Sequence, residues 1–170
     1  MYVLVGGVPG SGKTTLARQL APLLEVPLIA KDAIKEALMT ALGPPRDVAE
    51  SQRWGRASVL AMLTVAQSSP GAILDSTWYP YTIPYVQGLP GSIVEVRCVV
   101  SLDVAKQRYR ARTPTRHAGH LDEQRTEEEL WGTDTHQPLR LGPLVEVDTS
   151  GAVDVIAIAA AIQGAANSSR

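Results

Sequence analysis

Short apolar runs alternate with longer amphipathic stretches along most of the chain. The apolar runs predict five β-strands, at residues 2–6, 27–30, 72–74, 92–100 and 144–147. The amphipathic stretches predict helices at residues 12–24, 33–42, 47–67, 102–112 and 153–163. Because strands and helices alternate, we expect an α/β fold in which helices cover both faces of a five-stranded parallel sheet. The length of 170 residues is ordinary for one domain, so we expect a single domain over residues 1–170.

Three places depart from this regular pattern. Pro22 falls inside the first predicted helix, where a proline ends or kinks the helix. Residues 113–141 contain two prolines, all three histidines and many charges, so we expect an irregular segment there. Irregular segments of that length are usually functional, and we interpret the region of residues 108–141 as a mobile lid. The tail from Gly164 onward is small and polar, and we expect it to fray.

The loop after the first predicted strand has a sequence that binds phosphate in other proteins. It reads Gly7-Val8-Pro9-Gly10-Ser11-Gly12-Lys13-Thr14, the P-loop pattern in its strand–loop–helix setting. The glycines let main-chain N–H groups turn toward one anion, and the following helix adds its N-terminal donors. Lys13 would reach the β- and γ-phosphates, and the Thr14 hydroxyl would take a Mg²⁺ position. The expected nucleoside triphosphate contacts are Gly7, Pro9, Gly10, Ser11, Gly12, Lys13, Thr14 and Thr15.

Composition and charge limit the partners and the cellular location that we expect for this protein. Lys and Arg number 16 against 17 Asp and Glu, so no overall field draws the protein to nucleic acid or to a membrane. No apolar run approaches membrane-spanning length. Because the first predicted strand begins at residue 2, we expect no signal peptide. The single cysteine, Cys98, excludes an internal disulfide, and its apolar neighbours predict a buried thiol. We therefore expect a cytoplasmic protein with no membrane contact and no obligate protein partner.

Three further segments follow the P-loop in order. They are Lys31-Asp32 with Lys35, the run Ile73–Thr77, and Arg108 with Arg112. Together with the P-loop, these segments resemble the small P-loop kinases around adenylate kinase, and more closely the polynucleotide-kinase and zeta-toxin-like branch of that group. The resemblance spans residues 1 to about 150. It implies a three-layer P-loop fold closed by a lid, with ATP and Mg²⁺ as cofactors.

Asp32 and Lys35 follow the second predicted strand, on the sheet edge where open α/β sheets bind ligands. In the resembled kinases an aspartate at this place accepts the proton of the attacking hydroxyl. The alternative is a helix N-cap, for which aspartate is also favoured. A basic residue three positions after that aspartate helps to hold the acceptor in relatives, and Lys35 has that spacing. Its alternative is a solvated helix face.

Asp75 ends the third predicted strand, as the second acidic motif of P-loop proteins does. It would order a water on Mg²⁺ or accept a hydrogen bond from the Thr14 hydroxyl; the alternative is a simple turn residue. Polynucleotide kinases place their acid one position later, where this chain has Ser76, and an asparagine where it has Trp78. We retain Ser76 and Trp78 as candidate acceptor contacts.

Arg108 and Arg112 lie four residues apart, so they share one face of the predicted helix, and Arg116 continues that line. In the resembled kinases such arginines close over the triphosphate and stabilise the transferring phosphoryl group. The alternative is a basic surface helix. Ser150 and Gly151 follow the last strand, where relatives hold the adenine with main-chain groups. For His117 and His120 a role in the lid and a polar loop both stay open, whereas a transition-metal site is not supported.

The sequence does not identify the molecule that accepts the phosphoryl group. Four aromatic residues just past Asp75 could wall a pocket or form a small satellite core; they are Trp78, Tyr79, Tyr81 and Tyr85. The expected activity is transfer of the γ-phosphoryl group of ATP to a hydroxyl of a small molecule. One alternative is the 5′-hydroxyl of a polynucleotide, which would need a basic track from Lys31, Lys35, Arg46 and Arg53. The other is a nucleotide-binding switch or ATPase that is not a kinase.

Overall fold

A five-stranded parallel sheet forms the centre of the protein, in a computed structural model that describes residues 1–132 and 137–168. The strands are β1 (Tyr2–Gly6), β2 (Leu28–Ala30), β3 (Ala72–Asp75), β4 (Ile93–Val99) and β5 (Leu144–Asp148). Their order across the sheet is β2-β3-β1-β4-β5, and every neighbouring pair is parallel. The predicted fold class and all five strands are therefore confirmed. Because β1 lies between β3 and β4, the loop after β1 opens beside Asp75.

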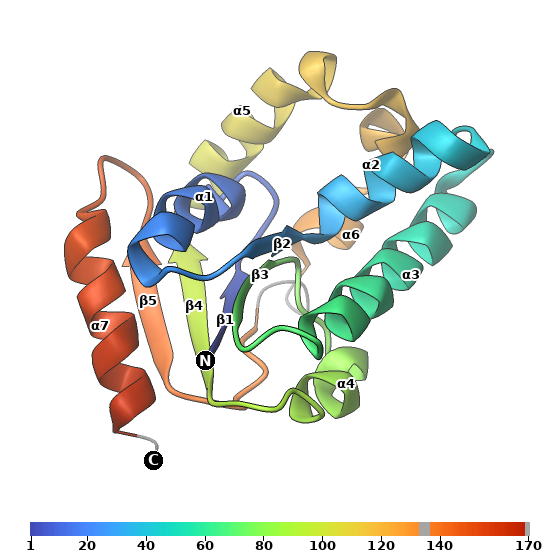
Figure 1. Ribbon diagram of the computed structural model, residues 1–170. Helices are drawn as coiled ribbons and strands as arrows, with labels where there is room; N and C mark the ends of the chain where they lie inside the picture. The colour runs from blue at the N-terminus through green and yellow to red at the C-terminus, as the bar shows by residue number, and fades with distance from the viewer. Residues whose placement is uncertain (133–136, 169–170) are drawn as a thin grey trace.

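Helices cover both faces of this sheet (Figure 1). They are α1 (Lys13–Leu24), α2 (Lys31–Leu42), α3 (Val48–Ala66), α4 (Ile83–Gln87), α5 (Leu102–Arg112), α6 (Glu127–Trp131) and α7 (Val155–Asn167). On one face, α1 and α7 bury Leu20 and Ile162 against Val3 and Val5 of β1. On the other, α3 and α4 pack against Tyr2 and Leu4. The chain is thus three layers deep, and within the described residues each helix is too short or too polar to cross a membrane.

Two helix ends bear on the predictions. The helix α1 ends at Leu24, as predicted, so Pro22 does not end it early: Leu20 and Leu24 remain packed in the core and offset one lost main-chain hydrogen bond. The helix then stops at Glu25, whose φ of 53° is left-handed. The tail does not fray at Gly164 either, since α7 continues to Asn167 and buries Ala166 in the core.

The segment after α5 is more regular than predicted. Three 3₁₀ turns occupy Thr113–Thr115, Ala118–His120 and Asp122–Gln124, and the short helix α6 follows. A capping box starts α6: Thr126 accepts from the Glu129 N–H, and the Glu129 carboxylate accepts from the Thr126 N–H. The spacing of Thr126 and Glu129 could have predicted this helix from the sequence. Part of the predicted lid, residues 133–136, lies outside the described residues.

Candidate active site

The loop between β1 and α1 has the geometry of a phosphate cradle. Gly10 adopts a φ of 85°, and a Cβ there would lie 2.1 Å from the carbonyl oxygen of Ala105 on α5. Gly12, with a φ of 87°, forms the N-cap of α1. Both positions therefore require glycine, since a side chain would be strained in this region. The first N–H groups of α1 have no intrahelical acceptor and are oriented for an anion, next to the predicted phosphate lysine Lys13.

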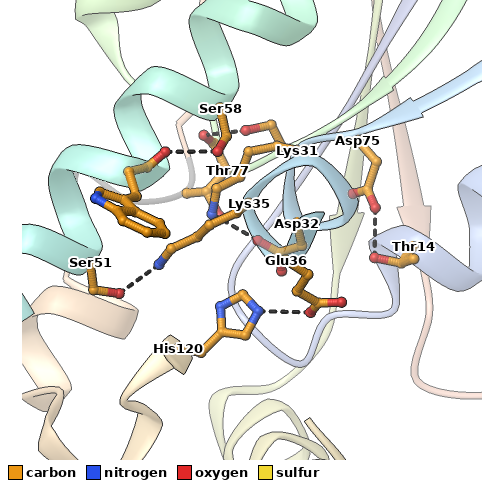
Figure 2. A network of polar contacts seen from close by, with 12 residues as sticks. Thr14, Lys31, Asp32, Lys35, Glu36, Ser51, Ser58, Asp75, Thr77 and His120 are labelled. Atoms are coloured by element: carbon orange, nitrogen blue, oxygen red, sulfur yellow. Dashed lines mark hydrogen bonds and ion pairs between the residues drawn. The ribbon is translucent and has the colours of Figure 1, made fainter. Parts of the chain in front are cut away.

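Thr14 and Asp75 meet at the edge of this loop. The Thr14 hydroxyl donates to Asp75 Oδ2 over 2.6 Å, as Figure 2 shows. This is one of the two predicted contacts of Asp75, and it follows from the parallel register that pairs Val5 with Asp75. Burial raises the pKa of Asp75, and the nearby Lys13 acts in the opposite direction. No group of three or more His, Cys, Asp or Glu side chains in the described part of the chain could hold a metal by itself.

A cavity of about 490 Å³ extends from the P-loop between α2, α3 and the segment after α5. This volume is typical of small-molecule sites. The predicted site residues that line it are Pro9, Lys13, Thr14, Asp32, Lys35, Asp75, Ser76, Arg112 and Arg116. Polar residues that the sequence analysis did not select also line it, namely Ser51, Gln52, Arg56, Tyr109, Asp122, Arg125 and Glu129. Tyr79 and Tyr81 stack at 6.1 Å on its wall, so part of the aromatic cluster belongs to the cavity.

Asp32 lies in the first turn of α2 and faces the cavity. Its carboxylate accepts from Lys31 Nζ at 2.8 Å and from Arg116 at 2.6 Å. The N-cap alternative is wrong, because α2 begins at Lys31 and Ala30 is its N-cap. Burial acts to raise the pKa of Asp32, but Lys31 and Arg116 outweigh it and hold this pKa well below its ordinary value. Asp32 is therefore an ionised acceptor of hydrogen bonds.

Arg116 connects the segment after α5 to α2. One nitrogen of its guanidinium donates to Asp32, and the other lies 2.7 Å and 2.8 Å from the two carboxylate oxygens of Asp122. Tyr109 of α5 also donates to Asp122, at 2.7 Å. Arg112 lies in the cavity wall with its guanidinium over the Tyr109 ring. Two of the three predicted arginines thus face the same cavity as Asp32.

Lys35 is not on a solvated face, since only 3% of it is exposed. Its Nζ donates to Ser51 Oγ on α3 at 2.6 Å (Figure 2). Ser51 Oγ in turn donates to the carbonyl oxygen of Gly119 at 3.3 Å. Burial, with Lys31 close by, lowers the pKa of Lys35 to about 8.

His117 and His120, in the segment after α5, have different partners. His120 Nε2 lies 2.8 Å from Glu36 Oε1, which ties the segment to α2 (Figure 2). Burial lowers the pKa of His120, and the adjacent Arg116 acts in the same direction. His117 accepts a hydrogen bond from the Gly119 N–H at its own turn. His120 thus helps to dock the segment, whereas His117 shapes a turn.

Several predicted residues lie outside the cavity. The prediction that Trp78 contacts the acceptor is wrong. Its indole N–H donates to the carbonyl of Val5, and its side chain is buried in the core, away from the cavity. Arg108 donates to the carbonyl oxygens of Thr149 and Ser150, so it ties α5 to the loop after β5. The other predicted residues that do not line the cavity are Gly7, Gly10, Ser11, Gly12, Thr15, Ser150 and Gly151. Their nucleotide contacts stay predictions.

The helix α6 docks directly on the P-loop. Trp131 donates from its indole nitrogen to the carbonyl oxygen of Pro9 at 3.2 Å. Its ring also meets Tyr109 edge to face, with centroids 5.3 Å apart. Gln52 of α3 donates to Glu129 of α6 at 2.7 Å. The segment after α5 therefore contacts both the P-loop and α3, and it covers the cavity in this structure.

Comparison with known proteins agrees with this geometry. The family model described as "AAA domain" (AAA_33) matches residues 3–131, three quarters of the chain. An uncharacterized protein of Mycobacterium tuberculosis, Rv2004c, is 35% identical over 125 residues, which cover 64% of this chain and 25% of that protein. The chain therefore spans about a quarter of the length of the curated relatives it matches.

Solved structures show the same architecture. A protein of Chloroflexus aurantiacus that is thought to be a kinase superposes with a TM-score of 0.81 at 31% identity, covering 96% of this chain and 97% of that one. A gluconokinase from Sinorhizobium meliloti superposes with a TM-score of 0.62 at 20% identity, covering 98% and 94%. The predicted resemblance to small P-loop kinases is confirmed, whereas the polynucleotide-kinase branch stays a prediction. The chain belongs to the AAA domain family AAA_33 and has the fold of the small P-loop kinases.

Proposed function

We propose that this protein is an ATP- and Mg²⁺-dependent kinase that phosphorylates a hydroxyl of a small molecule. The observation that carries the proposal is the position of Asp32, which faces the same 490 Å³ cavity as Lys13 and the Thr14–Asp75 pair. A phosphate cradle and an ionised carboxylate on one cavity are what in-line transfer to an alcohol requires. The size of the cavity favours a small acceptor.

The residues of the chain fit a nucleotide with its cation. The N–H groups at the start of α1 and the Lys13 ammonium suit phosphate oxygens, and the oxygens of Thr14 and Asp75 suit Mg²⁺. When bound, Mg²⁺ would neutralise charge that develops on the phosphates. Thr14 would hold the ion directly, and Asp75 would orient that hydroxyl or an ordered water.

Asp32 and the arginines then act on the acceptor. Asp32 would orient the hydroxyl and take its proton as the new oxygen–phosphorus bond forms and the bond to ADP breaks. Its low pKa makes it a weak base, so we assign it mainly to orientation, with the proton passing late. Arg112 and Arg116 would stabilise charge on the transferring group. The segment that holds Arg116 would also exclude water, which limits wasteful hydrolysis.

The decisive experiment compares transfer with nucleotide binding in Asp32→Asn. ATP turnover with Mg²⁺ would be measured with and without pooled hydroxyl acceptors, including a 5′-hydroxyl oligonucleotide. We expect acceptor-dependent turnover in the wild type and a loss of about 10²- to 10⁴-fold in the variant, with ATP affinity within threefold. Retained transfer in Asp32→Asn would remove Asp32 from the mechanism.

Two other functions have less support. A polynucleotide acceptor would need free basic side chains leading to the site, but Arg46 and Arg53 both pair with Glu50 on the outer side of α3. A nucleotide-binding switch would show slow turnover that no acceptor stimulates, and Asp32→Asn would leave it unchanged. The same assay therefore separates all three functions.

A further inference from the structure

The cavity walls carry more cations than carboxylates. Seven basic side chains line the cavity, against four aspartates and glutamates. Lys13 is the cation expected at the phosphate end. The others lie toward α2, α3 and the segment after α5, where an acceptor would be held.

Carboxylates of the protein pair with three of these cations. Arg116 pairs with Asp32 and Asp122, and Lys31 pairs with Asp32. Arg125 lies 3.5 Å from Glu129. Each of these three cations therefore has a counter-charge within the protein.

Lys35 differs from these cations. Its ammonium group hydrogen-bonds to a neutral hydroxyl, that of Ser51, and within the described residues no carboxylate lies at ion-pair distance from it. The positive groups of Lys31, Arg125 and Arg116 act on it, and Asp32 opposes them only in part. Burial of a charge without a paired counter-charge is costly, and an apolar side chain would avoid this cost. The cation at this place therefore needs a reason outside the folding of the chain.

An anion on the ligand would supply that reason. Lys35 lines the cavity and lies three residues after Asp32, so both side chains project from the same face of α2. Asp32 and Lys35 lie within one turn of α2, and both line the same cavity. One small molecule that bears a hydroxyl and an anionic group could therefore contact both side chains. Arg125, on the segment that closes the cavity, lies near enough to act on Lys35 and would meet the same group.

We propose that the acceptor is an anionic alcohol, in which a carboxylate or phosphate group binds to Lys35 and Arg125 while the hydroxyl binds to Asp32. This assignment rests on the proposed kinase function and names its substrate class. It makes Lys35 a specificity-determining residue. Neutral polyols would lack the partner for Lys35 and would bind more weakly.

Matched acceptors that differ in charge test this assignment. The first series is glycerol, glycerate and glycerol 3-phosphate, and the second is glucose, gluconate and glucose 6-phosphate. Transfer from ATP would be measured for each series in the wild type, Lys35→Met and Lys35→Arg. Arg18→Met is the control for loss of a positive charge, because Arg18 is exposed on α1 and does not line the cavity.

We expect at least one anionic member to exceed its neutral partner in kcat/KM by about 10- to 100-fold, the range of a charge-assisted hydrogen bond. Lys35→Met should abolish this preference by raising the KM for the anionic member far more than the KM for its neutral partner, whereas Arg18→Met should keep the wild-type preference. Lys35→Arg should restore part of it. Equal use of charged and neutral members by the wild type would overturn the assignment. So would equal loss of both in Lys35→Met, which would indicate a purely structural role.

A binding measurement separates this assignment from the kinase function. The same acceptors would be titrated by calorimetry into protein saturated with ADP and Mg²⁺. Binding of an anion that Lys35→Met abolishes supports the anionic subsite, even where no acceptor is phosphorylated and the kinase proposal fails. Absence of binding by every anion, together with phosphorylation of a neutral alcohol, rejects the subsite and leaves the kinase proposal intact.

Discussion

The phosphate end of the cavity is built from adjacent residues and main-chain groups, whereas the acceptor end is built from side chains far apart in the sequence. Residues 7–15 form the P-loop and the start of α1, and their geometry follows from glycines at left-handed positions. The acceptor end joins Asp32 to Arg116, 84 positions later. It also joins α3 to residue Gly119 through Ser51.

This difference predicts how each end responds to change. The phosphate end is rigid because its main chain is packed against α5 and held by the sheet. The acceptor end depends on ion pairs between distant segments, such as those of Arg116 with Asp32 and His120 with Glu36. One fold can therefore keep the same phosphate chemistry while the acceptor end changes its specificity.

Loss of the P-loop lysine should have the largest effect. Lys13→Met removes the positive charge beside the expected phosphates, and we expect kcat to fall by about 10³-fold or more. Acceptor binding, measured by calorimetry, should change less than threefold if the two ends are independent. Thr14→Ser is the matched control, since it keeps the hydroxyl that donates to Asp75. More than a tenth of wild-type kcat in Lys13→Met would contradict the phosphate assignment.

Loss of Arg116 should have the next largest effect. Arg116→Met breaks both ion pairs between the lid segment and its partners Asp32 and Asp122, and we expect kcat to fall by about 10²-fold. Without this cation the pKa of Asp32 should rise, because Arg116 helps to hold it low. The acid limb of the pH–kcat profile should therefore move to higher pH. Arg110→Met, on the exposed side of α5, is the control. An unchanged acid limb in Arg116→Met would show that Arg116 does not set the pKa of Asp32.

We expect the buried charge of Lys35 to lower the stability of the folded protein. Its pKa of about 8 lies below the ordinary value of 10.5, so the folded protein binds fewer protons than the unfolded chain between these values. Stability should rise with pH across that window, and the cost is fully present below pH 8. Lys35→Met should therefore raise the free energy of unfolding at pH 7 by up to about 3 kcal/mol, with a smaller gain near pH 10. Urea unfolding at pH 7 and pH 10 measures these changes in the free energy of unfolding. If Lys35→Met destabilised the protein at pH 7, the predicted cost of burying this charge would be wrong.

The contact between α6 and the P-loop should have the smallest effect. Trp131→Phe retains an aromatic edge against Tyr109 but loses the hydrogen bond to the Pro9 carbonyl. Because one such bond contributes about 1 kcal/mol, we expect a roughly fivefold rise in the KM for ATP. ATP hydrolysis without an acceptor should also rise relative to transfer, as the lid closes less well. Trp54→Phe on α3, outside the cavity, is the control; equal kinetics in both variants would remove α6 from lid closure.

Local patterns in the sequence were enough for the sheet and for the phosphate end. The P-loop, the strand that ends at Asp75 and the helix that begins near Asp32 each depend on residues adjacent in the chain, and the structure has all three. Cys98 is buried as its apolar neighbours predicted, and burial raises its thiol pKa to about 12. The capping box of Thr126 and Glu129 is an equally local pattern and is sufficient to predict the start of α6.

Only the tertiary structure decided the acceptor end. Trp78 looked like a pocket residue, but its indole hydrogen-bonds to β1 in the core. Lys35 could equally have been solvated, until the packing of α2 against α3 buried it beside Ser51. Asp122 and Trp131 had no local signal, because their roles depend on distant partners in the P-loop and in α5. The sequence by itself determined what its neighbouring residues build, while side-chain contacts between distant segments exist only after the chain has folded.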